Sequence, residues 1–312
     1  MFEQPIVDVL KDAKNVLLAG CGGGYDVMGA VPLYAALVER GCDVHLASLS
    51  FTYLNGLDGA IQSPLHPNLY EVPASAARAD EYCPEAWLAR FLQERSGRPR
   101  SVWAFDKTGV MPLAAAYQYV VEKLSIDTVV LIDGGIDALL RGDETSIGTP
   151  AEDLSSLAAV RRLDLPRKVL ACVGLGAEIR DGIAHEQVFA RIAELARAGA
   201  FLGSSSILPA TKAGALYMEA VEYVFANQLG LRNSHVHKVV LAAMRGEYGP
   251  DGPYIWLSPL LNVFWFFALD AVADTHLFLP KLAHTQGVWD MTAIIEAVRH
   301  ELDVKKRSAI PI

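Results

Sequence analysis

The N-terminal part of the chain predicts a strand, a glycine-rich loop, a helix and a second strand in direct succession. The apolar run Asn15–Ala19 is followed by the loop Gly20–Asp26, which reads GCGGGYD. Apolar spacing then predicts a helix from about Val27 to Arg40, and Asp43–Leu49 is again strand-like. A unit of this kind normally folds as two parallel strands joined by a right-handed helical crossover. It therefore directs the chain toward an α/β fold.

Strands and helices continue to alternate, which predicts a parallel sheet covered by helices on both faces. The 312 residues, 52% of them hydrophobic, suffice for one large core. We expect an α/β fold with a three-layer, doubly wound, mostly parallel sheet (Rossmann-like), as a single domain over residues 1–312. Residues 1–200 would form the sheet core, with an insertion at Phe51–Arg100 after the second strand, and residues 201–312 a helical C-terminal part with some strand. Further strands are expected at Ser101–Phe105, Val129–Ile132, Lys168–Val173 and Gly199–Gly203.

The densest group of charged residues follows the expected strand Val129–Ile132. Carboxylates gathered at the end of a buried strand repel one another unless a cation lies among them. The alternative is a solvated loop in which Asp143 or Thr149 starts a helix. The charged members of this group are Asp133, Asp137, Arg141, Asp143, Glu144 and Asp153.

The motif Gly-Gly-x-Asp occurs twice, each time after an expected strand. Gly23–Asp26 follows the first strand and Gly134–Asp137 the fourth. In the Rossmann strand order these two strands are neighbours, and ligands bind in the crevice at their carboxyl ends. We therefore predict that Asp26 and Asp137 lie on opposite sides of one pocket.

The glycine loop departs from the patterns that bind nucleotide cofactors. It contains Gly20-x-Gly22, but Tyr25 occupies the third glycine position of GxGxxG. The end of the second strand, Ala47–Ser50, lacks the carboxylate that holds the ribose of NAD. Ordinary NAD binding is therefore not expected, and no P-loop pattern follows.

Carboxylates at the ends of the expected strands point to magnesium as the cofactor. Asp26, Asp106, Asp133, Asp137 and Glu178 all follow such strands. Magnesium takes oxygen ligands and commonly uses one or two carboxylates together with substrate oxygens. We predict Asp26 and Asp137 as metal ligands, and Asp133 and Asp137 as ligand or general base.

Arg141 and Glu144 complete the predicted catalytic group. The Arg141 guanidinium could hold an anionic substrate through a bidentate contact. The alternative pairs Arg141 with Asp143 or Asp137 in a structural ion pair.

Two further groups could bind an anion. The amides of Gly22, Gly23 and Gly24 lie in a glycine turn before a helix, where partial positive charge gathers. Ser204, Ser205 and Lys212 precede or begin a later helix, and the alternative for them is a turn with a helix cap.

Cysteine and histidine residues give weaker signals. None of the four cysteines forms a CxxC pair, and Cys21 in the glycine loop is interpreted as a small buried residue. His235 and His237 could share one side of a strand, but Ser234–Arg245 is ambiguous between helix and strand. Met1–Asn15 has no secretory pattern, so reduced cysteines and a cytoplasmic location are expected.

Charge and hydropathy restrict the partners. The net charge of −9 argues against a nucleic-acid backbone as partner. The most apolar run, Leu260–Leu269, is about half the length of a membrane span. With Ser258 as N-cap and Pro259 after it, this run is expected to be a helix buried in the core or, as a second option, against another copy in a homo-oligomer.

The motifs GCGGGYD, DGGIDALLRGDE, GTPAED and GLGAE, in this order and spacing, resemble a bacterial and archaeal family known as a domain of unknown function. The resemblance covers most of the chain, from about Asn15 to the final helix. It implies a Rossmann-like α/β architecture and supplies no established reaction.

From the residues, the leading hypothesis is a magnesium-assisted hydrolase, lyase or group-transfer enzyme. Its substrate would be a small anionic metabolite, phosphorylated or nucleotide-like, bound in the cleft between the loops Gly20–Asp26 and Asp133–Glu144. One alternative is a non-catalytic protein that binds a nucleotide or metabolite in the same cleft. A third hypothesis is a structural oligomer in which the carboxylates serve as caps and ion pairs.

Overall fold

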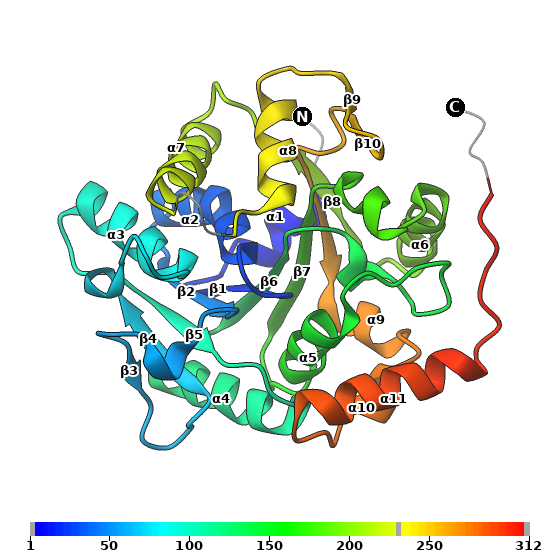
Figure 1. Ribbon diagram of the computed structural model, residues 1–312, viewed down its shortest axis with the longest axis horizontal. Coiled ribbons are helices and arrows are strands. Elements are labelled where there is room, and N and C mark those ends of the chain that lie inside the picture. The colour runs from blue at the N-terminus through cyan, green and yellow to red at the C-terminus, as the bar shows by residue number, and fades with distance from the viewer. Residues whose placement is uncertain (1–3, 229–231, 309–312) are drawn as a thin grey trace.

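A nine-stranded sheet forms the centre of the molecule in the computed structural model, which describes residues 4–228 and 232–308 (Figure 1). The strand order is β3-β4-β5-β2-β1-β6-β7-β11-β8, and a separate hairpin pairs β9 with β10. The strands are β1 Asn15–Gly20, β2 Asp43–Leu49, β3 Ile61–Gln62, β4 Leu69–Pro73, β5 Ser101–Phe105, β6 Thr128–Asp133, β7 Arg167–Val173, β8 Phe201–Ser206, β9 Gly249–Asp251, β10 Ile255–Leu257 and β11 Val263–Ala268.

The five central strands β5, β2, β1, β6 and β7 are parallel, as the alternation of strands and helices predicted. All residues of β6 are buried, since helices cover both faces of a parallel sheet. The predicted adjacency of the first and fourth strands of this parallel core, β1 and β6, is confirmed, with Gly20 opposite Ile132. The Rossmann-like fold class is therefore correct, and both glycine turns leave the same edge of the sheet.

Successive residues of β1 point into two different helical layers. Val16 and Leu18 belong to a hydrophobic cluster that contains residues of α1, α2, α3, α7 and α8, whereas Leu17 and Ala19 belong to one with residues of α4, α5, α6, α9, α10 and α11. The helices are α1 Pro5–Leu10, α2 Ala30–Glu39, α3 Pro84–Ser96, α4 Val110–Lys123, α5 Pro150–Arg161, α6 His185–Arg197, α7 Lys212–Asn227, α8 His235–Met244, α9 Leu269–Asp274, α10 Leu279–Leu282 and α11 Val288–Glu301.

Short 3-10 helices mark several loops. Three of them follow β1, β6 and β7 and carry the acidic residues Asp26, Asp137 and Glu178. They are η1 Asp26–Gly29, η2 Leu54–Gly56, η3 Ala74–Ala76, η4 Asp137–Leu139 and η5 Ala177–Asp181.

The predicted insertion after β2 adds two antiparallel strands to the sheet edge. β4 pairs with β5, and β3 pairs with β4. The insertion also contains α3, which Gly97 ends in a left-handed conformation (φ 64°) that suits glycine.

The apolar run Leu260–Leu269 was expected to be a helix, and this prediction was wrong. The structure places β11 there, antiparallel to both β7 and β8. Phe264 packs into one layer and Phe267 into the other, and β-branched and aromatic residues suit a strand buried on both faces. Ser258 and Pro259 lie in the turn before the strand. The burial of the run in the core is nevertheless confirmed.

The ambiguous segment Ser234–Arg245 is a helix, α8, which Ser234 caps by accepting a hydrogen bond from the N–H of His237 at 3.1 Å. Among the described residues, no helix combines the length and apolar character needed to cross a membrane.

Candidate metal centre

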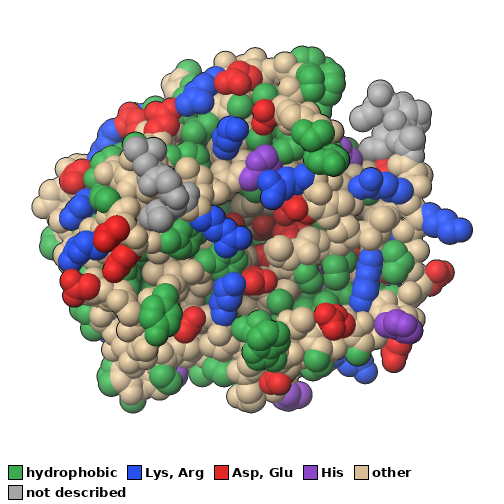
Figure 2. Space-filling view, viewed as in Figure 1, with side chains coloured by type: hydrophobic (Ala, Val, Ile, Leu, Met, Phe, Trp, Pro, Cys, Tyr) green, Lys and Arg blue, Asp and Glu red, His purple; other side chains and the backbone are tan. Residues whose placement is uncertain are grey.

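The carboxyl ends of β1, β6 and β7 meet at a hollow in the middle of one face of the molecule. Figure 2 shows acidic side chains on the floor of this hollow and basic side chains around its rim. The loops that follow the three strands supply the floor, because parallel strands end at the same edge of the sheet.

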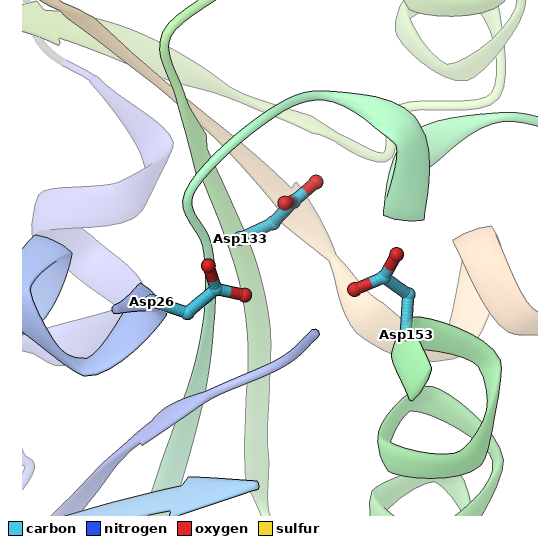
Figure 3. Close-up of side chains that lie close together, drawn as sticks. All are labelled: Asp26, Asp133 and Asp153. Atoms are coloured by element: carbon cyan, nitrogen blue, oxygen red, sulfur yellow. The ribbon is translucent and has the colours of Figure 1, made fainter. Parts of the chain in front are cut away.

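Three aspartates converge at this edge from three different elements (Figure 3). Asp26 begins η1 after the glycine loop, Asp133 ends β6, and Asp153 lies in the first turn of α5. One carboxylate oxygen from each lies within 4.8 Å of the other two. This spacing suits three oxygen ligands around one cation.

Two more carboxylates adjoin these three. Asp137 begins η4, and its Oδ2 accepts the N–H of Thr149 at 2.8 Å. Glu178 lies on η5, and its Oε2 accepts the N–H of Ile136 at 2.6 Å. The carboxyl group of Asp137 lies within hydrogen-bonding reach of those of Asp153 and Glu178. We call Asp26, Asp133, Asp137, Asp153 and Glu178 the carboxylate cluster.

Backbone amides orient two of the three converging aspartates. Oδ2 of Asp26 accepts the N–H of Gly22 at 2.7 Å, and Oδ2 of Asp133 accepts the N–H of Ala138 at 3.1 Å. Asp153 differs, because its Oδ2 is buried and has no hydrogen-bond partner among the described residues. The side chain of Asp153 is 2% exposed, so water does not compensate for the missing partner.

Glycines leave the space that these carboxylates occupy. A Cβ atom on Gly134 would lie 2.6 Å from Oδ1 of Asp26, closer than van der Waals contact allows. The same relationship holds between Gly22 and Asp153, Gly135 and Glu178, and Gly148 and Asp137. Gly134 does not have a positive φ, so glycine is needed there for this space rather than for the backbone conformation.

The cluster concentrates negative charge without an ion-pair partner in the part of the chain that the structure describes. Within residues 4–228 and 232–308, no Lys, Arg or His lies within 4.0 Å of these five carboxylates. Loss of solvent raises the pKa of Asp26 to about 7, and the charge of Asp137 adds to the rise, although the N–H of Gly22 opposes it. Burial, followed by repulsion from neighbouring carboxylates, raises the pKa of Asp133, Asp153 and Glu178 well above the usual range. Such groups are poised either to share protons or to bind a cation.

Two thiols lie next to the cluster. Burial raises the pKa of Cys21 and Cys172, and the charges of nearby aspartates raise both further. Both side chains therefore stay protonated at neutral pH. This agrees with the interpretation of Cys21 as a buried loop residue rather than a nucleophile.

The structure brings together most of the predicted strand-end carboxylates. Asp26, Asp133, Asp137 and Glu178 belong to the cluster, and Asp26 faces Gly134 of the opposite turn. Asp106 does not belong to it and is exposed beyond β5.

The glycine amides were expected to bind an anion and Glu144 to be catalytic, but Gly22 and Glu144 make hydrogen bonds within the protein. The N–H of Gly22 is already donated to Asp26, and the ring of Phe51 lies against Gly23 and Gly24. Glu144 is buried and accepts the N–H groups of Arg141 and Gly142 at 3.0 and 2.7 Å, so it braces its own loop.

The alternative, an ion pair of Arg141 with Asp143 or Asp137, is not formed among the described residues, and Asp143 instead pairs with Lys305 at 2.7 Å. The Nε atom of Arg141 is buried without a partner there. Substrate binding by Arg141 stays a prediction.

The second predicted anion site lies elsewhere on the sheet. Ser204 and Ser205 are on β8, the edge strand, which β11 and β7 separate from β6. Lys212 is exposed and pairs with Glu39. The helix-cap alternative is supported, because the Thr211 hydroxyl caps α7 by accepting the N–H of Gly214 at 3.0 Å.

His235 and His237 do not share one side of a strand, since they lie two residues apart on α8. His237 is buried, with Nδ1 2.7 Å from Oη of Tyr217 and Nε2 2.9 Å from the carbonyl oxygen of Tyr25. It is a structural residue in this arrangement.

Asp153 is the member of the centre that sequence reasoning did not assign to the site. It follows Thr149-Pro150, a helix start, where acidic residues are ordinary because they complement the helix dipole. The tertiary contact of α5 with the glycine turn gives Asp153 its importance, and local sequence contains no signal of that contact.

Comparisons with known proteins identify a family and nothing more specific. No curated protein and no solved structure matches the chain. A family model described as "Protein of unknown function (DUF1152)" matches residues 76–308, well over half of the chain. The matched part includes Asp133, Asp137, Asp153 and Glu178, whereas Asp26 and the first glycine turn precede it. The chain therefore belongs to the DUF1152 family.

Proposed function

We propose that the protein binds a divalent cation such as Mg²⁺ through Asp26, Asp133 and Asp153, and uses it to act on a small anionic metabolite. The reaction would be a hydrolysis, an elimination or a group transfer. Asp137, which is not one of these three ligands, is the proposed proton-transfer group.

The observation that carries this proposal is the buried, unpartnered Oδ2 of Asp153 beside two other carboxylates. An unpaired buried carboxylate is costly, and several together repel one another. A bound divalent cation removes both penalties at once. The third hypothesis, of caps and ion pairs only, accounts for Glu144 but leaves Oδ2 of Asp153 without a partner among the described residues.

The donor atoms favour a hard cation. The three converging ligands are all carboxylate oxygens, and the neighbouring Cys21 and Cys172 remain thiols. Oxygen ligands suit magnesium, manganese and calcium, whereas zinc favours sulfur and nitrogen. A cation held on one side by carboxylates can polarise a phosphoryl or carbonyl group, or lower the pKa of a bound water.

The carboxylates around the cation supply proton transfer. Burial raises the pKa of Asp137, and its carboxyl group lies within reach of Asp153 and Glu178. A carboxyl group with a pKa nearer neutrality can both accept and donate a proton at physiological pH. Arg141 remains our candidate for holding the substrate anion, because its Nε lacks a partner among the described residues.

Binding of Mn²⁺, observed by electron paramagnetic resonance, tests the proposal. We expect wild-type protein to bind Mn²⁺, Mg²⁺ to compete, and Asp153→Asn to lose at least tenfold in affinity. Asp106→Asn is the matched control, because Asp106 is an exposed aspartate at the same sheet edge outside the cluster. Equal Mn²⁺ affinity in Asp153→Asn and Asp106→Asn would contradict the metal assignment. Metal binding without turnover of any anionic substrate would favour the non-catalytic alternative.

A further inference from the structure

A second cavity lies beside the carboxylate cluster and has aromatic walls. Its volume is about 360 Å³, and Phe51, Tyr53, Glu81 and Tyr82 are among the residues that line it. The side chain of Tyr53 is 77% exposed, so an aromatic surface is available at the mouth. A cavity of this size is large enough for a small organic ligand.

The glycine turn joins this cavity to the carboxylate cluster. Gly22 meets Asp26 and Asp153 of the cluster, whereas Gly23, the next residue, meets the ring of Phe51. Consecutive Cα atoms are about 3.8 Å apart, so only the backbone of this turn separates the aromatic wall from the carboxylates. One ligand of moderate length can therefore contact both.

Two basic side chains lie over the Phe51 ring. Nζ of Lys107 is 3.8 Å from the ring centroid, and Cζ of Arg232 is 5.4 Å from it. Lys107 also pairs with Glu152 at 3.0 Å. Glu152 directly precedes Asp153, so Lys107 lies at the boundary between cavity and cluster. Positive charge at this boundary suits a phosphate group.

We propose that this cavity holds the base of a nucleoside phosphate, whose phosphates lie between Lys107, Arg232 and the metal centre. The inference rests on the proposed function, because the cation at the carboxylate cluster completes the phosphate site. Any of the nucleic-acid bases can stack on aromatic side chains, because every base has a flat π-face. The carboxylate of Glu81 adds an acceptor, since its Oε2 has no hydrogen-bond partner among the described residues. Bases carry N–H donors that can serve it.

This arrangement differs from a dinucleotide site. There the glycine-turn amides hold the pyrophosphate and a carboxylate at the end of the second strand holds the ribose. Here the N–H of Gly22 is donated to Asp26, and Glu85, which lies near Ser48 and Ser50 of that strand end, is completely buried.

The test compares ligands with and without a base by isothermal titration calorimetry in the presence of Mg²⁺. The probes are ADP, GDP, CDP and UDP, with pyrophosphate and ribose 5-phosphate as base-free references. We expect at least one nucleoside diphosphate to bind about tenfold or more tightly than pyrophosphate. Phe51→Ala should abolish this advantage, so that the nucleoside diphosphates bind that variant no better than pyrophosphate does.

Two controls keep the outcomes distinct. Binding of Mn²⁺ by Phe51→Ala reports whether that variant keeps its fold and its metal centre. Glu81→Gln preserves the shape of the cavity and should lower nucleoside diphosphate affinity without affecting Mn²⁺. If all four nucleoside diphosphates bind no better than pyrophosphate while Mn²⁺ binds normally, this inference fails and the proposed function stands. Absence of Mn²⁺ binding in the wild type overturns the proposed function itself, and with it the phosphate site described here.

Discussion

A Cβ atom on Gly22 would lie 2.0 Å from Oδ1 of Asp153. The φ angle of Gly22 is not positive, so the backbone conformation does not require glycine here. The amide of the same residue donates to Oδ2 of Asp26 at 2.7 Å. Gly22 is therefore needed because Asp153 fills the space where a side chain would be, and it positions two members of the carboxylate cluster together.

Gly22→Ala should weaken metal binding without unfolding the protein. The added methyl group forces the Asp153 carboxylate to rotate away, so we expect Mn²⁺ affinity to fall about 10- to 100-fold. Gly287→Ala is the control, because Gly287 has a φ of −132° and its Cβ would meet only Oδ2 of Asp290, at 4.0 Å. Equal Mn²⁺ titrations for the two variants would contradict the arrangement of Gly22 and Asp153.

Asp153→Asn should stabilise the metal-free protein at pH 8. The substitution removes one of several repelling buried charges, and the new amide can donate to a neighbouring carboxylate. We expect the free energy of unfolding to rise by about 1–3 kcal/mol, measured by urea denaturation in the presence of a chelator. Asp106→Asn changes an exposed group and should stay within about 0.5 kcal/mol of the wild type. A destabilised Asp153→Asn would mean that Asp153 is needed for folding rather than for a ligand.

Stability of the metal-free protein should fall as pH rises from 6.5 to 8. The pKa of Asp26 is about 7 in the folded state and about 3.9 in an unfolded chain. The folded state therefore binds more protons between these values, and this contribution to stability is complete below about pH 4 and lost as pH rises through 7. Asp133, Asp153 and Glu178 act in the same direction, because their pKa values are also raised.

Saturating Mn²⁺ should reverse this dependence, because a cation binds the ionised carboxylates and releases protons. Urea denaturation at pH 6.5 and pH 8, with chelator and with Mn²⁺, measures both slopes. The range avoids the buried histidines, since burial lowers the pKa of His237 to about 4 and of His276 to about 3, and their effect on stability lies below about pH 6.5. Equal slopes with chelator and with Mn²⁺ would count against a cation in the cluster.

The parallel core and the meeting of the two glycine turns were predictable because both depend on local patterns. Apolar β-branched runs indicate buried strands, and the adjacency of the first and fourth strands follows from the Rossmann strand order that the alternating pattern favours. With β1 beside β6, Asp26 and Asp137 necessarily follow neighbouring strand ends. The close approach of Asp153 was not predictable, since it depends on how α5 packs against the turn. Glu144 lies in the same acidic stretch but does not join the cluster, because it accepts hydrogen bonds from the backbone of its own loop.

The error at Leu260–Leu269 has a physical reason. A run that is apolar on every side indicates burial but does not distinguish a helix from a strand covered on both faces. Pairing with β7 and β8 makes this run a strand, and both partners are far from β11 in sequence. The aromatic and β-branched composition of Val263–Ala268 was the local signal that favoured a strand.

His237→Ala should lower both stability and metal affinity. Nε2 of His237 donates to the carbonyl oxygen of Tyr25, which accepts only, so Nδ1 accepts the hydroxyl of Tyr217. Removing the ring leaves both partners unsatisfied and a cavity in the core, and we expect a loss of about 2–4 kcal/mol in the free energy of unfolding. Because Tyr25 directly precedes Asp26, the loss should also misplace a ligand and weaken Mn²⁺ binding. His300→Ala, at an exposed position on α11, is the control for both measurements. A destabilised His237→Ala with unchanged Mn²⁺ affinity would show that the buried histidine supports the fold without positioning Asp26.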